Sequence, residues 1–465
     1  MAFVIVLAAL CFLMLVAYRG YSVILFAPVA AMGAVLLTDP GLVAPVFTGL
    51  FMEKMVGFLK LYFPVFLLGA IFGKVIELSG FSRSIVAATI RLVGRERAML
   101  SIVLVCALLT YGGVSLFVVV FAVYPFAAEL FRQSDIPKRL IPATIALGAF
   151  TFTMDALPGT PQIQNIIPTT FFGTDAWAAP TLGAIGAVFI LISGLSYLEW
   201  QRRKALAAGE GYGSSLVNEP VAFTEDRLAH PLLAILPLVL VGVSNKLFTA
   251  LIPRVYGASH EFAPAVIGDA KPVLQEVSKV AAIWAVEGAL LIGILSVLLF
   301  AWKPVRQRFA MGSQSAVGGA LLASMNTASE YGFGAVIASL PGFLVVANAL
   351  RAIPDPLVNE AVTVTALAGI TGSASGGMSI ALAAMADTFV QNANAAGISM
   401  EVLHRVAAMA SGGMDTLPHN GAVITLLAVT GLTHRQSYKD IFAITLIKTA
   451  AVFVVIAAFY TTGLV

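Results

Sequence analysis

The chain has 465 residues, of which 59% are hydrophobic and only 11% are charged, and its formal net charge is +3. Soluble domains carry roughly 25% charged residues, so this composition excludes a water-soluble protein of this size, and the small net charge gives no sign of a nucleic-acid partner. Apolar stretches of roughly 20 residues recur from end to end, which predicts an all-α polytopic membrane protein.

The expected membrane segments follow one another along the whole chain. The first lacks a basic region before it and a small-residue cleavage site after it, so we expect a retained helix. Some of the segments are too long for one simple crossing, among them 98–131 and 355–396. In chain order they cover 2–18, 21–37, 57–78, 98–131, 139–172, 178–198, 230–251, 279–301, 314–331, 355–396, 400–431 and 440–462.

The basic residues predict how the chain is oriented. They cluster in the connections, at Arg19, Arg83–Arg97, Arg132–Arg139, Arg202–Lys204, Lys303–Arg308 and Arg435–Lys439. All these connections fall on one side if 98–131 and 355–396 each enter and leave the membrane on the same side. The positive-inside rule makes that side cytoplasmic. The charges therefore predict two re-entrant hairpins, one from each side, and termini that both face the periplasm.

Three short signals occur twice in the same order, at an offset of about 260 residues. "ELSGFSRSIVA" from Glu77 resembles "EYGFGAVIA" from Glu330, "GGVS" resembles "GGMS", and "MDALP" resembles "MDTLP". Because the two hairpins open to opposite sides, the repeats are inverted, as in many secondary transporters. We expect scaffold segments at 1–80 and 230–333, arm helices with transport segments at 81–200 and 334–465, and a cytoplasmic linker at 201–229.

Glycine pairs mark the expected hairpin tips. A backbone without partners survives at membrane depth only where it lines a cavity or binds something, and the start of a half-helix suits a carboxylate. The alternative is that these small residues only allow close helix packing. The candidates for substrate binding are Thr110, Gly112, Gly113 and Ser115 at the first tip, and Ser373, Ser375, Gly376, Gly377 and Ser379 at the second.

Each Asp-x-Leu-Pro motif predicts a broken helix, because proline ends one half-helix and starts another. Asp155 and Asp415 have two open roles: capping a half-helix, or carrying a proton, which a carboxylate in a low dielectric takes up more readily. His419 is a further titrating candidate or a packing residue. The candidate binding residues at the breaks are Thr160, Gln162, Asn165, Thr416, His419 and Asn420.

Glu77 and Glu330 are expected at the junctions between a span and an arm along the surface, and Glu330 is also a candidate for proton coupling. The arginines of 83–97 alternate with apolar faces, as in an interfacial helix. The lysines near or in the spans are interpreted as snorkelling to the surface or contacting a lipid headgroup; they are Lys54, Lys60, Lys74 and Lys448. The chain shows no motif for an enzyme, a metal site or a cofactor.

Several long motifs resemble the gluconate permease family of proton symporters, within the ion transporter superfamily. They are "MDALPGTPQIQNIIPTTFFGTDAWAAPTLG", "SEYGFGAVI", "ASGGMDTLPHNGAVITLL" and "GLTHRQSYKDI", and the resemblance covers essentially the whole chain. The stretch "DTLPHNGA" is most similar to the branch that carries D-3-hydroxybutyrate. The resemblance implies a scaffold and a transport domain, elevator-type movement, a homodimer and coupling to protons, although related families use sodium.

Neither tip nor break contains a lysine or arginine in the sequence, so an anionic substrate needs compensation from helix ends, hydroxyls, His419 or a co-transported cation. This favours a small monocarboxylate over a di- or tricarboxylate. The sequence therefore predicts a proton-coupled symporter for a small hydroxy-monocarboxylate in the bacterial inner membrane, surrounded by lipid. D-3-hydroxybutyrate is the first candidate and gluconate the second, and a passive anion channel or exchanger is the alternative.

Overall fold

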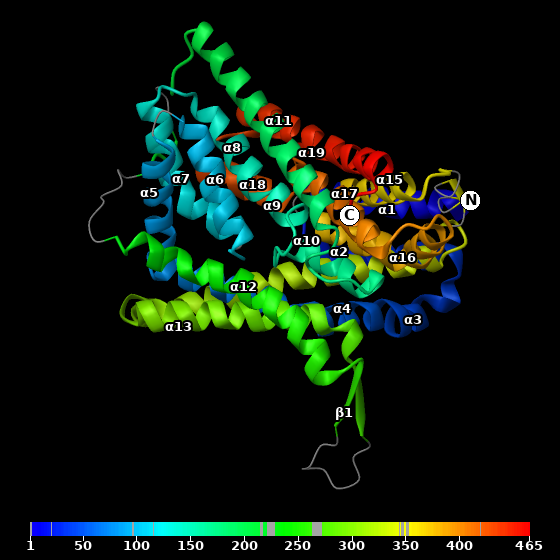
Figure 1. Cartoon of the computed structure of the whole chain (residues 1–465). Helices are drawn as coiled ribbons and strands as arrows, with labels where there is room; N and C mark the ends of the chain where they lie inside the picture. The colour runs from blue at the N-terminus through cyan, green and yellow to red at the C-terminus, as the bar shows by residue number, and fades with distance from the viewer. Residues whose placement is uncertain are drawn as a thin grey trace.

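The chain is an all-α polytopic membrane protein (Figure 1). The computed structural model describes residues 2–19, 21–94, 97–114, 116–213, 217–220, 228–262, 272–343, 345, 348–349, 353–418 and 420–465. Five helices in this part are long and apolar enough to cross a membrane, namely Pro40–Leu78, Pro180–Ala207, Pro231–Tyr256, Ala281–Ser339 and His434–Thr462. Shorter apolar helices of 10–17 residues are Ala2–Leu13, Val23–Thr38, Ala98–Tyr111 and Gly421–Thr430.

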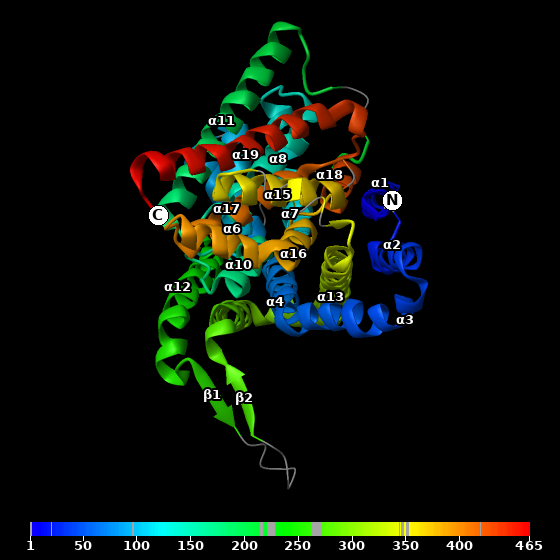
Figure 2. The ribbon, with the colours of Figure 1, turned by 90° about the vertical axis from the view of Figure 1, so that its right-hand side faces the viewer.

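One set of helices, here called the long-helix group, packs around the longest helix of the chain. Its members are α1 (Ala2–Tyr18), α2 (Val23–Thr38), α4 (Met52–Leu78), α12 (Pro231–Tyr256) and α13 (Ala281–Ser339). Helix α13 packs along α4, α12 and α2, and these helices run together along one side of the molecule in Figures 1 and 2. Short turns lead into α4, namely η1 (Pro40–Leu42), α3 (Val43–Val46) and η2 (Phe47–Phe51).

Two expected span boundaries in this group are wrong. The helical stretch that ends at Leu78 begins at Pro40, well before the expected start at 57. The expected span 279–301 ends where two helices meet at a kink at Ala301, where φ is −133° and ψ is 34°, but the second helix runs on to Ser339, beyond the expected end at 331. Pro304 accounts for the kink, since its ring clashes with the carbonyl four residues earlier and it lacks an amide hydrogen.

The remaining helices form a second set, here called the hairpin group. Each half of the chain contributes a helical hairpin, a broken helix and one long helix, in the same order. The first half supplies α6 (Ala98–Tyr111), α7 (Leu116–Gln133), η4 (Lys138–Leu140), α8 (Ile141–Ala149), α9 (Phe152–Asp155), α10 (Ile163–Phe172) and α11 (Pro180–Ala207). The second half supplies α15 (Pro356–Thr371), α16 (Ala374–Ala395), α17 (Met400–Gly412), η6 (Gly413–Thr416), α18 (Gly421–Thr430) and α19 (His434–Thr462).

The two groups meet along few elements. Helix α16 packs on α13, while α10 contacts both α4 and α13. Helix α5 (Phe81–Val93) bridges them, since it packs on α12 and α4 as well as on α6 and α7. Within the hairpin group the halves interlock, because α11 packs on α19 and α10 packs on α17. Figure 2 shows α15, α16 and α19 stacked above the ends of α4 and α13.

The two expected arms fare differently. In the first, α5 buries Phe81, Ile85 and Val86 and so follows the expected amphipathic pattern. In the second, residues 334–339 simply continue α13, and the rest of 334–350 lies partly outside the described residues. Glu330 is therefore inside a continuous helix, and its expected place at a span end is wrong. Glu77 does lie one residue before the end of α4.

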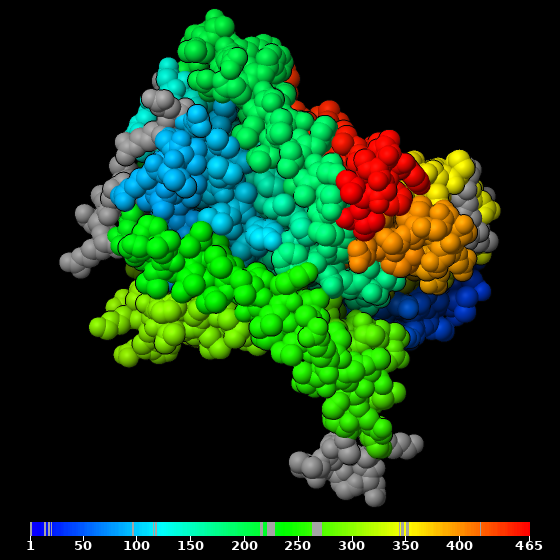
Figure 3. Space-filling view, viewed as in Figure 1, coloured from blue at the N-terminus to red at the C-terminus, as the bar shows by residue number. Residues whose placement is uncertain are grey.

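A two-stranded hairpin was not expected from the sequence. Strand β1 (Ser259–Phe262) pairs antiparallel with β2 (Val273–Glu276), with Phe262 opposite Val273. The hairpin projects from the body of the molecule below α12 (Figure 3). Each strand has four residues and is largely exposed. Such short strands give no clear pattern in a sequence that is mostly apolar helix.

The described part of the linker is docked on the hairpin group. Tyr124 of α7 donates a hydrogen bond to the Asn218 carbonyl (2.8 Å), and the Asn218 side chain donates to Ala428 of α18 (2.9 Å). Glu219 forms ion pairs with Lys138 (2.7 Å) and with Arg132. Burial opposes ionisation of the Glu219 carboxyl, but these two cations lower its pKa below the usual value. The linker therefore connects α7, the second helix of the first hairpin, to α18.

Candidate functional site

The first hairpin tip is closed. Gly113 has φ +96°, a conformation that L side chains rarely adopt, and a Cβ added there would lie 3.2 Å from both Leu290 and Pro161. A Cβ on Gly112 would lie 2.4 Å from Leu238 of α12. The amide of Val114 donates back to Leu109 (3.0 Å), so the backbone satisfies itself. This tip packs against the long-helix group and presents no free amide at Val114.

Among the other candidates at this tip, Thr110 is fully buried and its hydroxyl has no hydrogen-bond partner. Ser115 lies outside the described residues. The tip is joined to the first break by two hydrogen bonds. Tyr111 donates to the Pro158 carbonyl (2.8 Å), and the Gln162 amide donates to the Thr110 carbonyl (2.7 Å). Gln162 thus connects the two expected parts of the first half.

Most polar groups of the first break bond within the protein. The Thr160 hydroxyl donates to the Thr153 carbonyl (2.8 Å), and the Asn165 amide donates to the carbonyls of Thr160 (3.0 Å) and Ala176 (2.8 Å). Both side chains are fully buried. They hold the extended segment between α9 and α10 in shape, so neither is exposed to a ligand in this conformation.

A buried arginine compensates the first break. Arg405 of α17 is fully buried, and its guanidinium donates to the Asp155 carbonyl (2.6 Å), the Asn165 side chain (3.0 Å) and the Ala178 carbonyl (2.7 Å). His404 beside it lies 3.3 Å from the Asn165 oxygen. The guanidinium satisfies carbonyls that the interrupted helix leaves free. The break itself contains no lysine or arginine, and α17 supplies this cation to it.

A second buried cation binds Asp155 itself. The Lys448 ammonium lies 2.6 Å from the Asp155 carboxylate, and both side chains are essentially inaccessible. The same ammonium donates to the carbonyls of Gly412 (2.6 Å) and Phe150 (2.9 Å), one beside each break. Lys448 lies too deep in α19 to reach water, so its interpretation as a snorkelling residue is wrong. It links the two breaks and neutralises Asp155.

The second hairpin tip is more open and richer in hydroxyls. Ser373 caps α16 by accepting a hydrogen bond from the Gly376 amide (3.1 Å). The Ser375 hydroxyl lies 3.4 Å from the Ser373 hydroxyl and 3.2 Å from that of Thr327 on α13. Both serines stay partly exposed, whereas Ser379 is buried and bonds to the Ser375 carbonyl (2.6 Å).

The glycines of this tip have separate packing roles. A Cβ on Gly377 would lie 2.0 Å from the Ala368 Cα, so this glycine brings α15 and α16 into close contact. A Cβ on Gly376 would lie 1.5 Å from a carboxylate oxygen of Glu330. Glu330 is 3% exposed, and this oxygen has no hydrogen-bond partner. A carboxylate of the long-helix group therefore covers the start of α16.

Asp415 joins the second tip to both breaks. Its carboxylate accepts hydrogen bonds from the Ala374 amide (2.9 Å) at the start of α16 and from the Gln164 side chain (2.9 Å) of the first break. Asn420 donates to the Gly372 carbonyl (2.8 Å) and caps α18 by accepting from the Ala422 amide (2.7 Å). The Thr416 hydroxyl is buried against Thr445 (2.7 Å). His419 lies outside the described residues.

The structure thus gathers three of the four expected points around Asp415, while the first tip joins through Gln162. Four of the candidate polar residues at the tips and breaks stay partly exposed, namely Gln162, Ser373, Ser375 and Asn420. Sequence reasoning missed Lys448 and Arg405. A lysine at the middle of a 29-residue membrane helix was the available signal, because snorkelling works only near helix ends.

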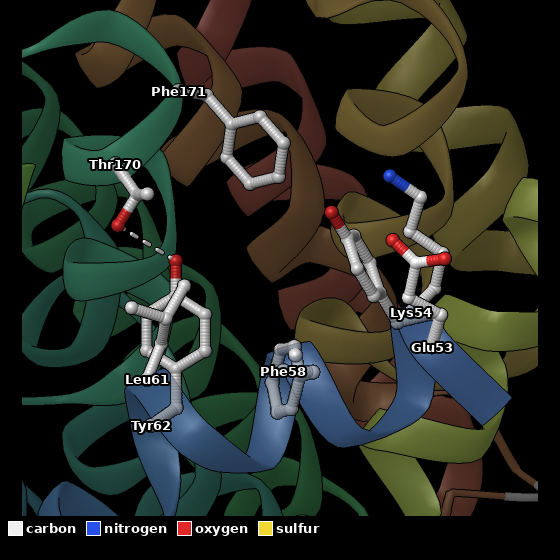
Figure 4. Close-up of a pocket in the computed structure, with 9 residues that line it drawn as sticks. Glu53, Lys54, Phe58, Leu61, Tyr62, Thr170 and Phe171 are labelled. Atoms are coloured by element: carbon white, nitrogen blue, oxygen red, sulfur yellow. Dashed lines mark hydrogen bonds between the residues drawn. The ribbon is translucent and has the colours of Figure 1, made fainter. Parts of the chain in front are cut away.

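One cavity lies between the two helix groups beside this region (Figure 4). Its volume is about 290 Å³. The Tyr62 hydroxyl of α4 lies 3.0 Å from the Thr170 hydroxyl of α10, and Figure 4 shows Glu53 and Lys54 at the other end of the same stretch of α4. The lining residues are Glu53, Lys54, Gly57, Phe58, Leu61, Tyr62, Thr170, Phe171 and Tyr331.

Comparison with known proteins identifies one full-length relative. The chain is 61% identical over 474 residues to a protein of Bacillus subtilis (strain 168) described as the uncharacterized transporter YxjC, with 100% of each chain covered. Among solved structures, that of the Alcanivorax borkumensis YdaH transporter, reported to have an unusual topology, gives a TM-score of 0.48 at 14% identity. That alignment covers 92% of this chain and 90% of the other. No model of a known protein family matches the chain.

Proposed function

Since the chain belongs to the same transporter family as YxjC, we propose that it is a proton-coupled symporter for a small hydroxy-monocarboxylate. D-3-hydroxybutyrate is the favoured substrate, in line with the gluconate-permease resemblance of the motif that begins at Asp415. The family relation supports a membrane transporter, and the substrate, the coupling ion and the mechanism are our proposals. We place it in the bacterial inner membrane with both termini periplasmic.

The observation that carries the proposal is the contact of Asp415 with Ala374 of the second tip and Gln164 of the first break. Broken helices at membrane depth are tolerated where they line a binding region. The partly exposed hydroxyls and amides around this contact suit one carboxylate and one hydroxyl. We propose that the substrate binds between Ser375, Asn420 and Gln162, while Thr160, Asn165 and Thr416 support the site from behind.

The charges of this region favour symport with a cation. Three buried carboxylates, Asp155, Asp415 and Glu330, lie in this region with two buried cations, Lys448 and Arg405. A bound monocarboxylate adds a negative charge, which is costly in a low dielectric unless it is paired. A proton taken up together with the substrate restores neutrality. We propose Glu330 and Asp415 as the proton-coupling groups, together with His419, and assign Asp155 to a permanent pair with Lys448.

The arrangement of the two helix groups supports movement of one against the other. We propose that the long-helix group is the scaffold, that the hairpin group is the transport domain, and that it slides as in an elevator. The contact between Glu330 and Gly376 would break and reform during this movement. A homodimer through the scaffold would hold the fixed part in the membrane.

Uptake into proteoliposomes tests the proposal. Labelled D-3-hydroxybutyrate should accumulate above the external concentration when the outside is acidic, and a protonophore should abolish accumulation. A panel with gluconate, lactate and succinate ranks the substrates, with and without sodium. Mere equilibration would indicate a passive channel, and sodium-driven uptake without pH dependence would reject proton coupling.

Substitutions then separate coupling from capping. Glu330→Gln and Asp415→Asn should each weaken the pH dependence of net uptake, while counterflow exchange of substrate persists in Glu330→Gln. Unchanged pH dependence in both variants would remove these residues from the coupling pathway. Asp415 would then serve only to cap α16.

A further inference from the structure

The cavity between α4 and α10 is adjacent to the second tip. Tyr331 of α13 lines the cavity, and the residue before it, Glu330, covers Gly376 at the start of α16. Consecutive residues on one helix point to neighbouring positions about 100° apart around its axis. The same turn of α13 therefore borders both the cavity and the tip.

The lining of this cavity has an ionic end and a hydroxyl end. Figure 4 shows Glu53 and Lys54 rising from α4 at one end, and Tyr62 meeting Thr170 at the other. Phe58 lies on α4 between these ends, and Phe171 projects from α10 above it. The Phe58 ring lies 5.7 Å from that of Tyr331, centroid to centroid. An apolar wall thus separates two polar ends.

This composition is unusual for a contact between membrane helices. Such contacts are normally made by small residues in close packing, whereas here α4 and α10 leave a volume of about 290 Å³. Charged side chains within membrane segments usually face such cavities and mark the path of a solute. The volume is at the small end of the range for ligand pockets, so it suits a molecule of few heavy atoms.

We propose that this cavity is an approach site for a small 3-hydroxycarboxylate. Lys54 binds the carboxylate, the Glu53 carboxylate accepts a hydrogen bond from the substrate hydroxyl, and the aliphatic tail packs on Phe58 and Phe171. The anion then passes to the second tip when Glu330 leaves Gly376. This inference rests on the proposed function, because it assigns a first stop for the same substrate.

Initial uptake rates in proteoliposomes test the site, with labelled D-3-hydroxybutyrate and labelled butyrate as the two probes. Butyrate keeps the carboxylate and lacks the hydroxyl. Lys54→Gln should raise KM for both probes about 10-fold with little change in kcat, and Lys54→Arg should retain most of the wild-type KM. Glu53→Gln should raise KM for hydroxybutyrate alone, which reduces the preference over butyrate.

Lys60→Gln is the matched control, since Lys60 is an exposed lysine of α4 outside the residues that line the cavity. If Lys54→Gln and Lys60→Gln give the same KM while wild type transports, the approach site is refuted and the proposed function stands. If wild type transports neither probe, the proposed function itself fails. Equal KM changes for both probes in Glu53→Gln would refute recognition of the hydroxyl.

Discussion

The two hairpin tips arise from corresponding parts of a repeat and yet differ in chemistry. The first tip is buried, its Val114 amide bonds back to Leu109, and Gly112 and Gly113 pack on side chains of the long-helix group and the first break. The second tip exposes Ser373 and Ser375 in part. The difference teaches that a repeated glycine pair fixes a turn in the chain, while the neighbours decide whether that turn can bind a ligand.

The two Asp-x-Leu-Pro motifs differ in the same way. Asp155 faces Lys448 at 2.6 Å, whereas Asp415 accepts an amide hydrogen bond from α16 and one from Gln164. The Asp155 carboxylate is thus paired with a cation, whereas the Asp415 carboxylate accepts hydrogen bonds from a backbone amide and from an amide side chain. A group held by hydrogen bonds alone can exchange a proton or a partner more readily than one in a buried ion pair.

The largest effect is expected when the buried ion pair is broken. Lys448→Met leaves the Asp155 carboxylate buried without its cation, which should destabilise the fold by about 3–5 kcal/mol. The double variant Asp155→Asn with Lys448→Met should recover much of this loss, because no uncompensated charge remains. Thermal unfolding of the purified protein in detergent measures both variants against wild type.

Two further variants extend the thermal-unfolding measurement to a control lysine and to the second Asp-x-Leu-Pro motif. Lys439→Met removes an exposed lysine of the same helix and should leave the midpoint unchanged. Asp415→Asn should cost only about 1 kcal/mol, because the asparagine oxygen still accepts from the Ala374 amide and its NH2 group can donate to the Gln164 oxygen once that side-chain amide turns over. An equal loss in Lys448→Met and Lys439→Met would contradict the assigned role of the pair.

A smaller loss of stability is expected when an alanine replaces a glycine at either tip, and its size should differ between the tips because they pack differently. Gly377→Ala forces a methyl group onto the backbone of Ala368, and overpacking of this kind costs about 1–3 kcal/mol. The nearest atoms to a methyl group in Gly112→Ala belong to the Leu238 side chain and not to a backbone, and most of them move when this side chain rotates, so its cost should be lower. Gly318→Ala, in α13 with nothing near the added methyl, is the neutral control. A larger loss in Gly112→Ala than in Gly377→Ala would reverse the order.

The smallest effect is expected at the linker that ties the first hairpin to α18. Glu219 is a partly exposed partner of Lys138 and Arg132, so Glu219→Gln should cost about 1 kcal/mol or less. Because the folded pKa of Glu219 is lowered, its contribution is present above the unfolded pKa and is lost as pH falls through the folded pKa. The thermal midpoints of wild type and variant should therefore differ at neutral pH and become equal at acidic pH.

The sequence was sufficient for the large features of this fold. The distribution of basic residues and the glycine pairs predicted both hairpins, and the Asp-x-Leu-Pro motifs predicted both broken helices, because proline has no backbone donor and clashes with the preceding turn. The pairing of distant residues could not be predicted. Lys448 and Asp155 are almost 300 residues apart, and a single sequence does not show which buried charges lie together. The β1–β2 hairpin was missed because its two strands are short and exposed. The continuation of α13 to Ser339, beyond the kink at Ala301, was also missed.

Equilibrium binding of labelled D-3-hydroxybutyrate to purified variants tests the central claim most directly. Ser375→Ala alters a partly exposed hydroxyl of the second tip, and Thr110→Val removes a buried hydroxyl of the first tip without changing its shape. The account predicts at least about 10-fold weaker binding in Ser375→Ala, which corresponds to about 1.4 kcal/mol, and wild-type affinity in Thr110→Val. Weaker binding in Thr110→Val with full affinity in Ser375→Ala would contradict it.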